Sequence, residues 1–193
     1  MKNALFMIDR LSTWTGKAIA WAVVLLTLIV CYDVAARYIF RSPTQWGFDV
    51  AIILYGVLFM MAGAYTLSRN GHVRADMMYR SLQPRTQAWI DVALYVLFFF
   101  PGIAALAYAG VEFAQISWAM RETSSVTSAG TPIYPFKAVI PIAGALLLLQ
   151  GIAEVVRCVV CIRTNQWPQR LHDVEEEDIE QLKEILASPE ARS

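Results

Sequence analysis

The sequence predicts an all-α integral membrane protein with four transmembrane helices. Of its 193 residues, 57% are hydrophobic and 17% are charged, whereas soluble domains average about 25% charged residues. The apolar residues gather in four blocks of at least about 20 residues, each long enough to cross about 30 Å of hydrocarbon as a helix. Because 16 Lys and Arg balance 16 Asp and Glu, the chain lacks the surplus positive charge that nucleic-acid binding needs.

The four blocks form one predicted transmembrane domain, residues 18–162. We expect its helices at about residues 18–40, 48–68, 87–112 and 137–162. Pro101 and Pro141 lie inside two of them, and transmembrane helices tolerate proline because neighbouring groups satisfy the freed backbone. A kink is expected near Pro101. The first block is not expected to be a cleaved signal peptide, since its apolar core exceeds the usual length of about 7–15 residues.

Residues 1–17 are predicted to form an amphipathic helix that lies in the membrane interface. Apolar and polar residues alternate there at helical spacing. The apolar side contains Ala4, Leu5, Met7, Ile8, Leu11, Trp14 and Ala18, and the other side contains Lys2, Asp9, Arg10, Ser12 and Thr13. Such a helix serves as a membrane anchor or packs against a partner, and both interpretations stay open.

The basic residues near the helix ends predict the orientation. Lys and Arg concentrate on the cytoplasmic side of membrane proteins. One side of this chain has Lys2, Arg10, Lys17, Arg69, Arg74, Arg80, Arg85, Arg157, Arg163 and Arg170, and the other has Arg37, Arg41, Arg121 and Lys137. Both termini are therefore expected in the cytoplasm. Residues 163–193 should form an acidic cytoplasmic tail with a short amphipathic helix, which is either solvated or docked on a partner.

The sequence contains no recognisable catalytic, cofactor-binding or metal-binding constellation, so we expect no enzyme activity. His72 and His172 lie outside the apolar blocks, where they cannot ligate a haem inside the bundle. Cys158 and Cys161 form a Cys-x-x-Cys pair, which allows the alternative of a membrane thiol oxidoreductase. The charge pattern places the pair at the reducing cytoplasmic side, where packing is the more ordinary role.

Charged residues avoid the centres of the predicted helices. Insertion of a charge at mid-membrane costs about 2.5–3.5 kcal/mol, so a charge there would mark a transport path. Local pairs at helical spacing are expected between Asp33 and Arg37 and between Glu154 and Arg157. The charged residues near helix ends are Asp33, Asp49, Asp91, Glu112, Glu154 and Arg157. Without a central charge the chain is predicted to be a scaffold, and a self-sufficient small transporter is the alternative.

Residues 46–85 are the most distinctive stretch of the sequence. Trp46 is expected at the outer interface, where amphipathic aromatic residues gather. Asn70-Gly71 is a turn signal that ends the second helix. His72, Arg74 and Asp76 follow at alternate positions. They are suited to binding lipid headgroups or to holding a neighbouring subunit, and both interpretations stay open.

This stretch resembles the small membrane subunit of tripartite ATP-independent periplasmic (TRAP) transporters, the DctQ type. The resemblance covers about residues 15–162, and its most specific element is His72-Val73-Arg74-Ala75-Asp76. Asp49 stands where the family usually has Glu, and Tyr55 where it often has Trp. Further matching positions are Trp46, Gly63-Ala64, Arg69, Leu82-Gln-Pro84-Arg85, Trp118, Arg121-Glu122-Thr-Ser124 and the run from Pro132 to Pro141.

The resemblance implies a function as well as a fold. In this family the small subunit is a scaffold beside a large membrane subunit in the bacterial inner membrane. The large subunit binds sodium and imports an organic acid that a periplasmic binding protein delivers, so this chain itself is expected to need no cofactor. The candidate residues for subunit or phospholipid contact are Trp46, Asp49, Tyr55, Arg69, His72, Arg74, Asp76 and Arg85.

Overall fold

The computed structural model describes residues 2–69, Tyr79 and residues 82–170. Within these residues the chain is helical, without a β-strand. The helices are α1 (Lys2–Tyr38), α2 (Gly47–Ser68), α4 (Pro84–Leu94), the π-helical turn η1 (Tyr95–Phe99), α5 (Phe100–Met120) and α6 (Tyr134–Thr164). Because α4, η1 and α5 are continuous, the described residues contain four helices long and apolar enough to cross a membrane. This agrees with the predicted number of transmembrane helices.

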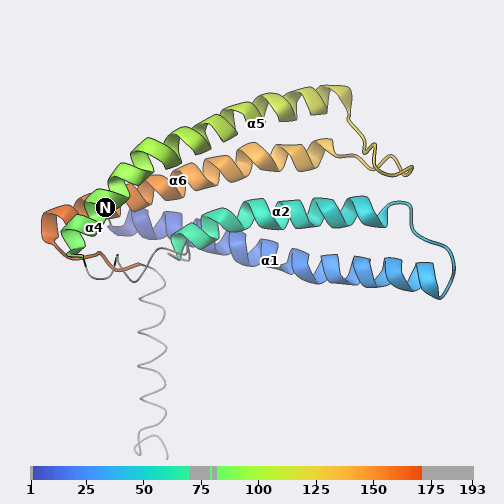
Figure 1. The fold of residues 1–193 in the computed structure, drawn as a ribbon, viewed down its shortest axis with the longest axis horizontal. Helices are drawn as coiled ribbons and strands as arrows, with labels where there is room; N and C mark the ends of the chain where they lie inside the picture. Colours follow the sequence, from blue (N-terminus) through green and yellow to red (C-terminus); the bar gives the residue numbers. More distant parts are fainter. Residues whose placement is uncertain (1, 70–78, 80–81, 171–193) are drawn as a thin grey trace, which may run out of the picture.

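The four long helices lie side by side in a row, in the order α5, α6, α2, α1 (Figure 1). Each helix contacts its neighbour along its length, and α1 also contacts α6 near its own N-terminal end. A row buries less surface than a closed bundle. In the most apolar stretch of α1, 0% of the residues are buried within the chain. Most apolar side chains are therefore left for contact with lipid or with another protein.

The two helix hairpins of the row are displaced along the helix axes. Gly56 of α2 lies against the ring of Phe136, close to the start of α6, and Gly63 lies against Leu147. Gly16 of α1 lies against Tyr65 of α2. The hairpin of α1 and α2 consequently extends past α6 at one end of the molecule, and α4 and α6 extend past α2 at the other (Figure 1).

The N-terminal region differs from expectation in two respects. α1 continues without a break through Lys17, so no separate helix covers residues 1–17. Its apolar residues Met7 and Trp14 are 72% and 73% exposed, whereas Asp9 and Ser12 on the polar side are 1% and 2% exposed. The polar side thus faces the protein, because partners for it exist on α6. The level at which the membrane surface crosses α1 stays a prediction.

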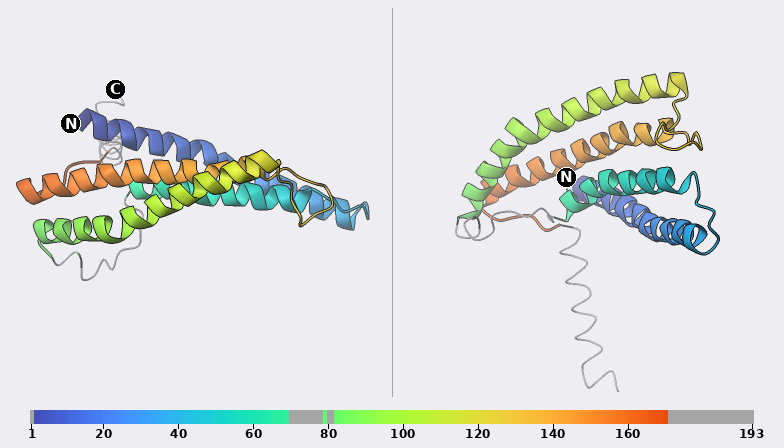
Figure 2. Two further views of the ribbon diagram at one scale, coloured as in Figure 1. Left: turned by 90° about the horizontal axis from the view of Figure 1, so that it is seen from above. Right: turned by 45° about the vertical axis from the view of Figure 1, so that its right-hand side comes forward.

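The third transmembrane helix is longer than predicted at both ends. It begins at Pro84, a residue suited to the first helical turn because its missing N–H is not needed there. The π-helical turn η1 directly precedes Pro101, whose missing N–H disturbs the regular ladder, and the chain bends between α4 and α5 (Figure 2). The helix ends at Met120 instead of residue 112, before Arg121 in a left-handed conformation (φ 47°). The predicted tail helix lies outside the described residues.

Candidate functional site

A cluster of polar side chains is buried where α1 crosses α6. We call it the Arg157 cluster; its members are Asp9, Ser12, Gln150, Glu154, Arg157 and Arg170. The Arg157 guanidinium lies 2.5 Å from Asp9 Oδ2 and 2.6 Å from Glu154 Oε1. Gln150 accepts a hydrogen bond from Ser12 Oγ at 2.8 Å and donates one to Asp9 Oδ1 at 3.0 Å. Polar residues of α1 and α6 therefore satisfy one another inside an apolar protein.

The segment after α6 completes this cluster from a second side. α6 ends at Asn165, which has a left-handed conformation (φ 55°) and turns the chain back. Trp167 Nε1 then donates to Gln87 Oε1 of α4 at 3.0 Å. Arg170 donates to both carboxylate oxygens of Glu154, at 3.1 and 2.8 Å, and to the Ser68 carbonyl of α2 at 3.4 Å. These few residues tie α2, α4 and α6 together.

The charges of the Arg157 cluster balance. Two carboxylates, Asp9 and Glu154, face two guanidinium groups, Arg157 and Arg170. Glu154 is 2% exposed and Arg157 is 1% exposed, and charges that are removed from water are tolerated only when they are paired and hydrogen-bonded. Within the Arg157 cluster, the Arg157 Nε atom is buried without a hydrogen-bond partner among the described residues. The cluster suits fixed packing of helices, since each charge is already held by its opposite.

At the other end of the molecule, carboxylates at the helix ends hold the connecting segments. Asp49 near the start of α2 is 4% exposed and accepts hydrogen bonds from Ser124 Oγ at 2.8 Å and from Thr127 Oγ1. We call Asp49, Ser124 and Thr127 the Asp49 cluster. Asp33 of α1 accepts from Thr44 N and Thr44 Oγ1, and pairs with Arg37 at 3.1 Å. The predicted pairs Asp33–Arg37 and Glu154–Arg157 are both present.

Glu122 and Lys137 join the end of α5 to the start of α6. Lys137 Nζ donates to Glu122 Oε2 at 2.5 Å, and the ammonium also lies 4.0 Å from the centre of the Phe113 ring. The hydrogen bond from Lys137 lowers the pKa of the Glu122 carboxyl below its ordinary value, with a smaller contribution from Ser117. Nearby, Thr123 and Pro132 form a short bridge across the connection. This connection is therefore held at several points.

The predicted contact residues that the structure describes lie at several places along the helix row. Trp46 stacks on Tyr32 at 6.2 Å, and Tyr55 is 60% exposed and stacks on Phe59 at 6.4 Å. Arg69 lies 5.2 Å from the centre of the Tyr65 ring at the end of α2, and Arg85 is exposed in the first turn of α4. Asp49 belongs to the Asp49 cluster, which joins α2 to the connection between α5 and α6. His72, Arg74 and Asp76 lie outside the described residues.

Cys158 and Cys161 are packing residues in this structure. They are 1% and 0% exposed, and they form a small apolar core with Ala88 of α4. A thiol that exchanges electrons with a partner has to be accessible. Burial of both sulfur atoms supports the packing interpretation over the oxidoreductase alternative.

The Arg157 cluster could not be assembled from the sequence alone. The sequence places Asp9 and Ser12 on the polar side of a predicted interfacial helix, and it counts Arg170 among the cytoplasmic basic residues without a partner. Gln150 is not among the predicted site residues. A signal was present, because Gln150, Glu154 and Arg157 recur at helical spacing on one face of an apolar block. That pattern predicts that another helix packs a row of polar residues against this face.

Comparison with known proteins agrees with this architecture. The family model described as "Tripartite ATP-independent periplasmic transporters, DctQ component" matches residues 26–161, well over half of the chain. No curated protein matches this chain. The matched range runs from the apolar part of α1 to Cys161, and it includes both ends of the helix row. The chain belongs to the DctQ family and is a small membrane subunit of a TRAP transporter.

Proposed function

We propose that the chain is the fixed scaffold of a sodium-coupled TRAP transporter in the bacterial inner membrane. It holds a large membrane subunit that binds sodium and moves an organic acid, which a periplasmic binding protein delivers. The observation that carries this proposal is the match to the DctQ family model together with the positions and pairing of the charged residues in the fold. The charged groups at the helix ends that face the protein are engaged in internal pairs. No acidic or basic residue occurs in the four apolar stretches 18–32, 50–68, 92–111 and 138–153.

A transport path needs polar groups at mid-membrane that bind and release a solute. The row offers apolar side chains there, and it has broad exposed faces on which a larger protein can pack. The Arg157 and Asp49 clusters hold the row together at its two ends. A rigid row of this kind suits a subunit that stays in place while a neighbour moves.

The outer end of the row is proposed to help dock the binding protein. Arg41 and Arg121 are exposed there, each in a left-handed conformation that ends a helix (φ 53° and 47°). The described residues give neither side chain a hydrogen bond or an ion pair, whereas Asp33, Asp49 and Glu122 are already engaged. An acidic patch on the binding protein would complement this surface.

Reconstitution tests the scaffold role. Vesicles that contain this chain, the large subunit or both are supplied with binding protein, a sodium gradient and a panel of labelled organic acids. Uptake is expected only with both membrane subunits. Accumulation by this chain alone would make it a self-sufficient transporter, and full uptake by the large subunit alone would refute the scaffold role.

The docking role has its own test. Arg41→Glu combined with Arg121→Glu should raise the binding-protein concentration for half-maximal uptake by about tenfold, because opposite charges become like charges. Arg85→Glu, at the opposite end of the row, is the matched control and should leave that concentration unchanged. An unchanged concentration in the double variant would exclude docking at these arginines.

A further inference from the structure

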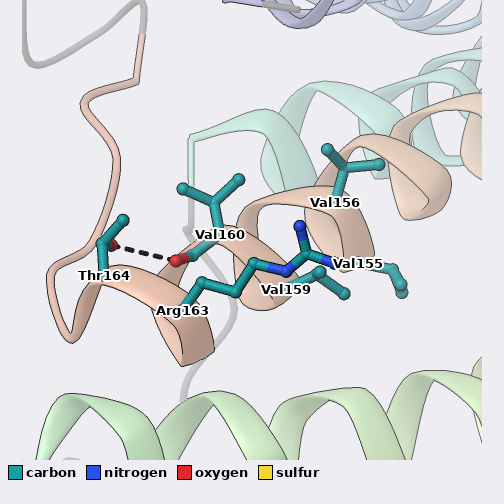
Figure 3. Close-up of a pocket in the computed structure, with 6 residues that line it drawn as sticks. All are labelled: Val155, Val156, Val159, Val160, Arg163 and Thr164. Atoms are coloured by element: carbon teal, nitrogen blue, oxygen red, sulfur yellow. Dashed lines mark hydrogen bonds between the residues drawn. The ribbon is translucent and has the colours of Figure 1, made fainter.

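The last turns of α6 carry a pocket on a face that no other described helix covers. Its lining consists of Val155, Val156, Val159, Val160, Arg163 and Thr164 (Figure 3). The four valines form an apolar strip that is open to the side, and Val159 is 39% exposed. From Val155 to Arg163 the strip runs for about 12 Å along the helix. It lies on a different face from the buried residues Glu154 and Arg157.

Arg163 is the charged end of this strip. Its side chain extends back along the helix toward Val155 and Val156 (Figure 3). Of the arginines that follow the middle of α6, Arg157 and Arg170 are neutralised by Asp9 and Glu154. In the described part of the chain Arg163 has no hydrogen bond or ion pair, and it is exposed. A guanidinium in this position is available to an external anion.

The depth of Arg163 indicates which anion. α6 has 31 residues, which corresponds to about 46 Å, longer than the hydrocarbon core of about 30 Å and comparable to a bilayer with its headgroups. The backbone of Arg163 lies in the last turn of this helix, near the level of the phosphates, which its long side chain can reach. Guanidinium groups bind phosphate through two parallel hydrogen bonds, and basic sites beside membrane helices recognise phospholipid headgroups.

We propose that this pocket is a phospholipid-binding site. The phosphate of one glycerophospholipid pairs with the Arg163 guanidinium, and an acyl chain lies along Val155, Val156, Val159 and Val160. Both halves of the ligand follow from the lining, since the strip of valine side chains carries a single cation, to which the described residues give no hydrogen bond or ion pair. Lipid bound here would cover the exposed face of α6. It would not disturb the Arg157 cluster, which lies on the face of α6 that packs against α1.

Native mass spectrometry of the full-length protein, titrated with phosphatidylglycerol, measures the site directly. Arg163→Ala should weaken the tightest bound lipid by about tenfold, because a charge-assisted contact is lost. Val159→Trp should also weaken the binding of this lipid, because the indole side chain occupies the apolar strip while the Arg163 guanidinium remains. Arg10→Ala, which removes an exposed arginine at the same end of the molecule, is the control and should change nothing. Equal lipid affinity of Arg163→Ala and wild type would overturn the proposal.

Two further arms separate lipid from other ligands. Glycerol phosphate should compete poorly, because it lacks the acyl chain, and diacylglycerol should bind wild type and Arg163→Ala equally, because it lacks the phosphate. Equal competition by glycerol phosphate would make the site a simple phosphate site and refute the proposal. A photoreactive amino acid at position 159 should crosslink to lipid in the assembled transporter. Exclusive crosslinking to the large subunit would show that protein, not lipid, covers this face.

Discussion

The Arg157 cluster and the Asp49 cluster hold opposite ends of the same helix row by different means. The Arg157 cluster uses full charges of both signs that are buried between α1 and α6. The Asp49 cluster uses one carboxylate that accepts hydrogen bonds from the hydroxyls of Ser124 and Thr127. A buried ion left without its partner is far more costly than a hydroxyl that can turn to water. The two ends should therefore respond very differently to the loss of one side chain.

Arg157→Ala should have the largest effect, because it leaves Asp9 and Glu154 buried with one fewer cation. Breaking a buried pair in this way costs about 3–5 kcal/mol. The measurement is the free energy of unfolding of the purified protein in mixed detergent micelles. Arg85→Ala, an exposed arginine, serves as the control with little change. A loss no larger than that of the control would mean that the Arg157 cluster does not stabilise the row.

Asp49→Ala should have a moderate effect. The variant frees two hydroxyl groups near the surface and releases the 121–133 connection from α2, but it creates no buried charge. The unfolding midpoint should fall by less than half of the decrease in Arg157→Ala, and Ser124→Ala should show part of that decrease. If Asp49→Ala is the more damaging of the two variants, the proposed difference between the clusters is wrong.

Replacing Cys158 and Cys161 together by Ala separates packing from charge at the Arg157 end. Both residues are as deeply buried as Arg157, yet their replacement removes only small apolar volume. We expect a loss of about 1–2 kcal/mol and uptake by the assembled transporter within a few-fold of wild type. Complete loss of uptake with normal membrane insertion would favour the thiol oxidoreductase alternative.

The smallest effect is expected at Glu122 and concerns pH. The pKa of Glu122 in the folded protein lies below its ordinary value of 4.5, so the unfolded chain binds this proton more readily. The contribution of Glu122 to stability is therefore present above about pH 4.5 and is lost as the pH falls through the folded pKa. Thermal unfolding of wild type and Glu122→Gln should differ at pH 7 and converge at low pH. A difference that persists or grows in acid would contradict this assignment.

The sequence was sufficient for the parts of the fold that depend on neighbouring residues. Long apolar blocks predict the four helices, and helical spacing predicts the pairs Asp33–Arg37 and Glu154–Arg157, both of which are present. The bond between Arg157 and Asp9 joins residues 148 positions apart. Periodicity shows that each of these residues lies on a polar face, but it does not tell which helices are neighbours.

Helix ends were also less predictable than helix centres. The end of α5 at Met120 depends on the contacts of the 121–133 connection, among them the pairing of Glu122 with Lys137. The burial of Asp9 and Ser12 on α1 similarly depends on Gln150 and Arg157 of α6. Among the candidate contact residues, Asp49 is hydrogen-bonded to hydroxyl groups of Ser124 and Thr127, which are donors that a carboxylate is expected to find.

The displacement of the two hairpins has a consequence for how the protein sits in a bilayer. Because Phe136 lies against Gly56 and Leu147 against Gly63, the apolar block of α6 begins about 9–15 Å further along the axis than the block of α2. The apolar block of α1 is offset from that of α2, and the block of α5 from that of α6, by smaller distances. Both offsets have the same direction across the row as the offset between α2 and α6. Upright helices would push much of each block out of a hydrocarbon slab about 30 Å thick.

Leaning all four helices in the plane of the row brings every block back into the slab. The required tilt is about 40°, at the upper end of the range for membrane helices. The helix row is then inclined to the membrane normal, and the surface that the small subunit presents to its neighbour is inclined in the same way. Any subunit that packs along this surface has to be inclined with it. A thicker bilayer would make the helices of both subunits more upright.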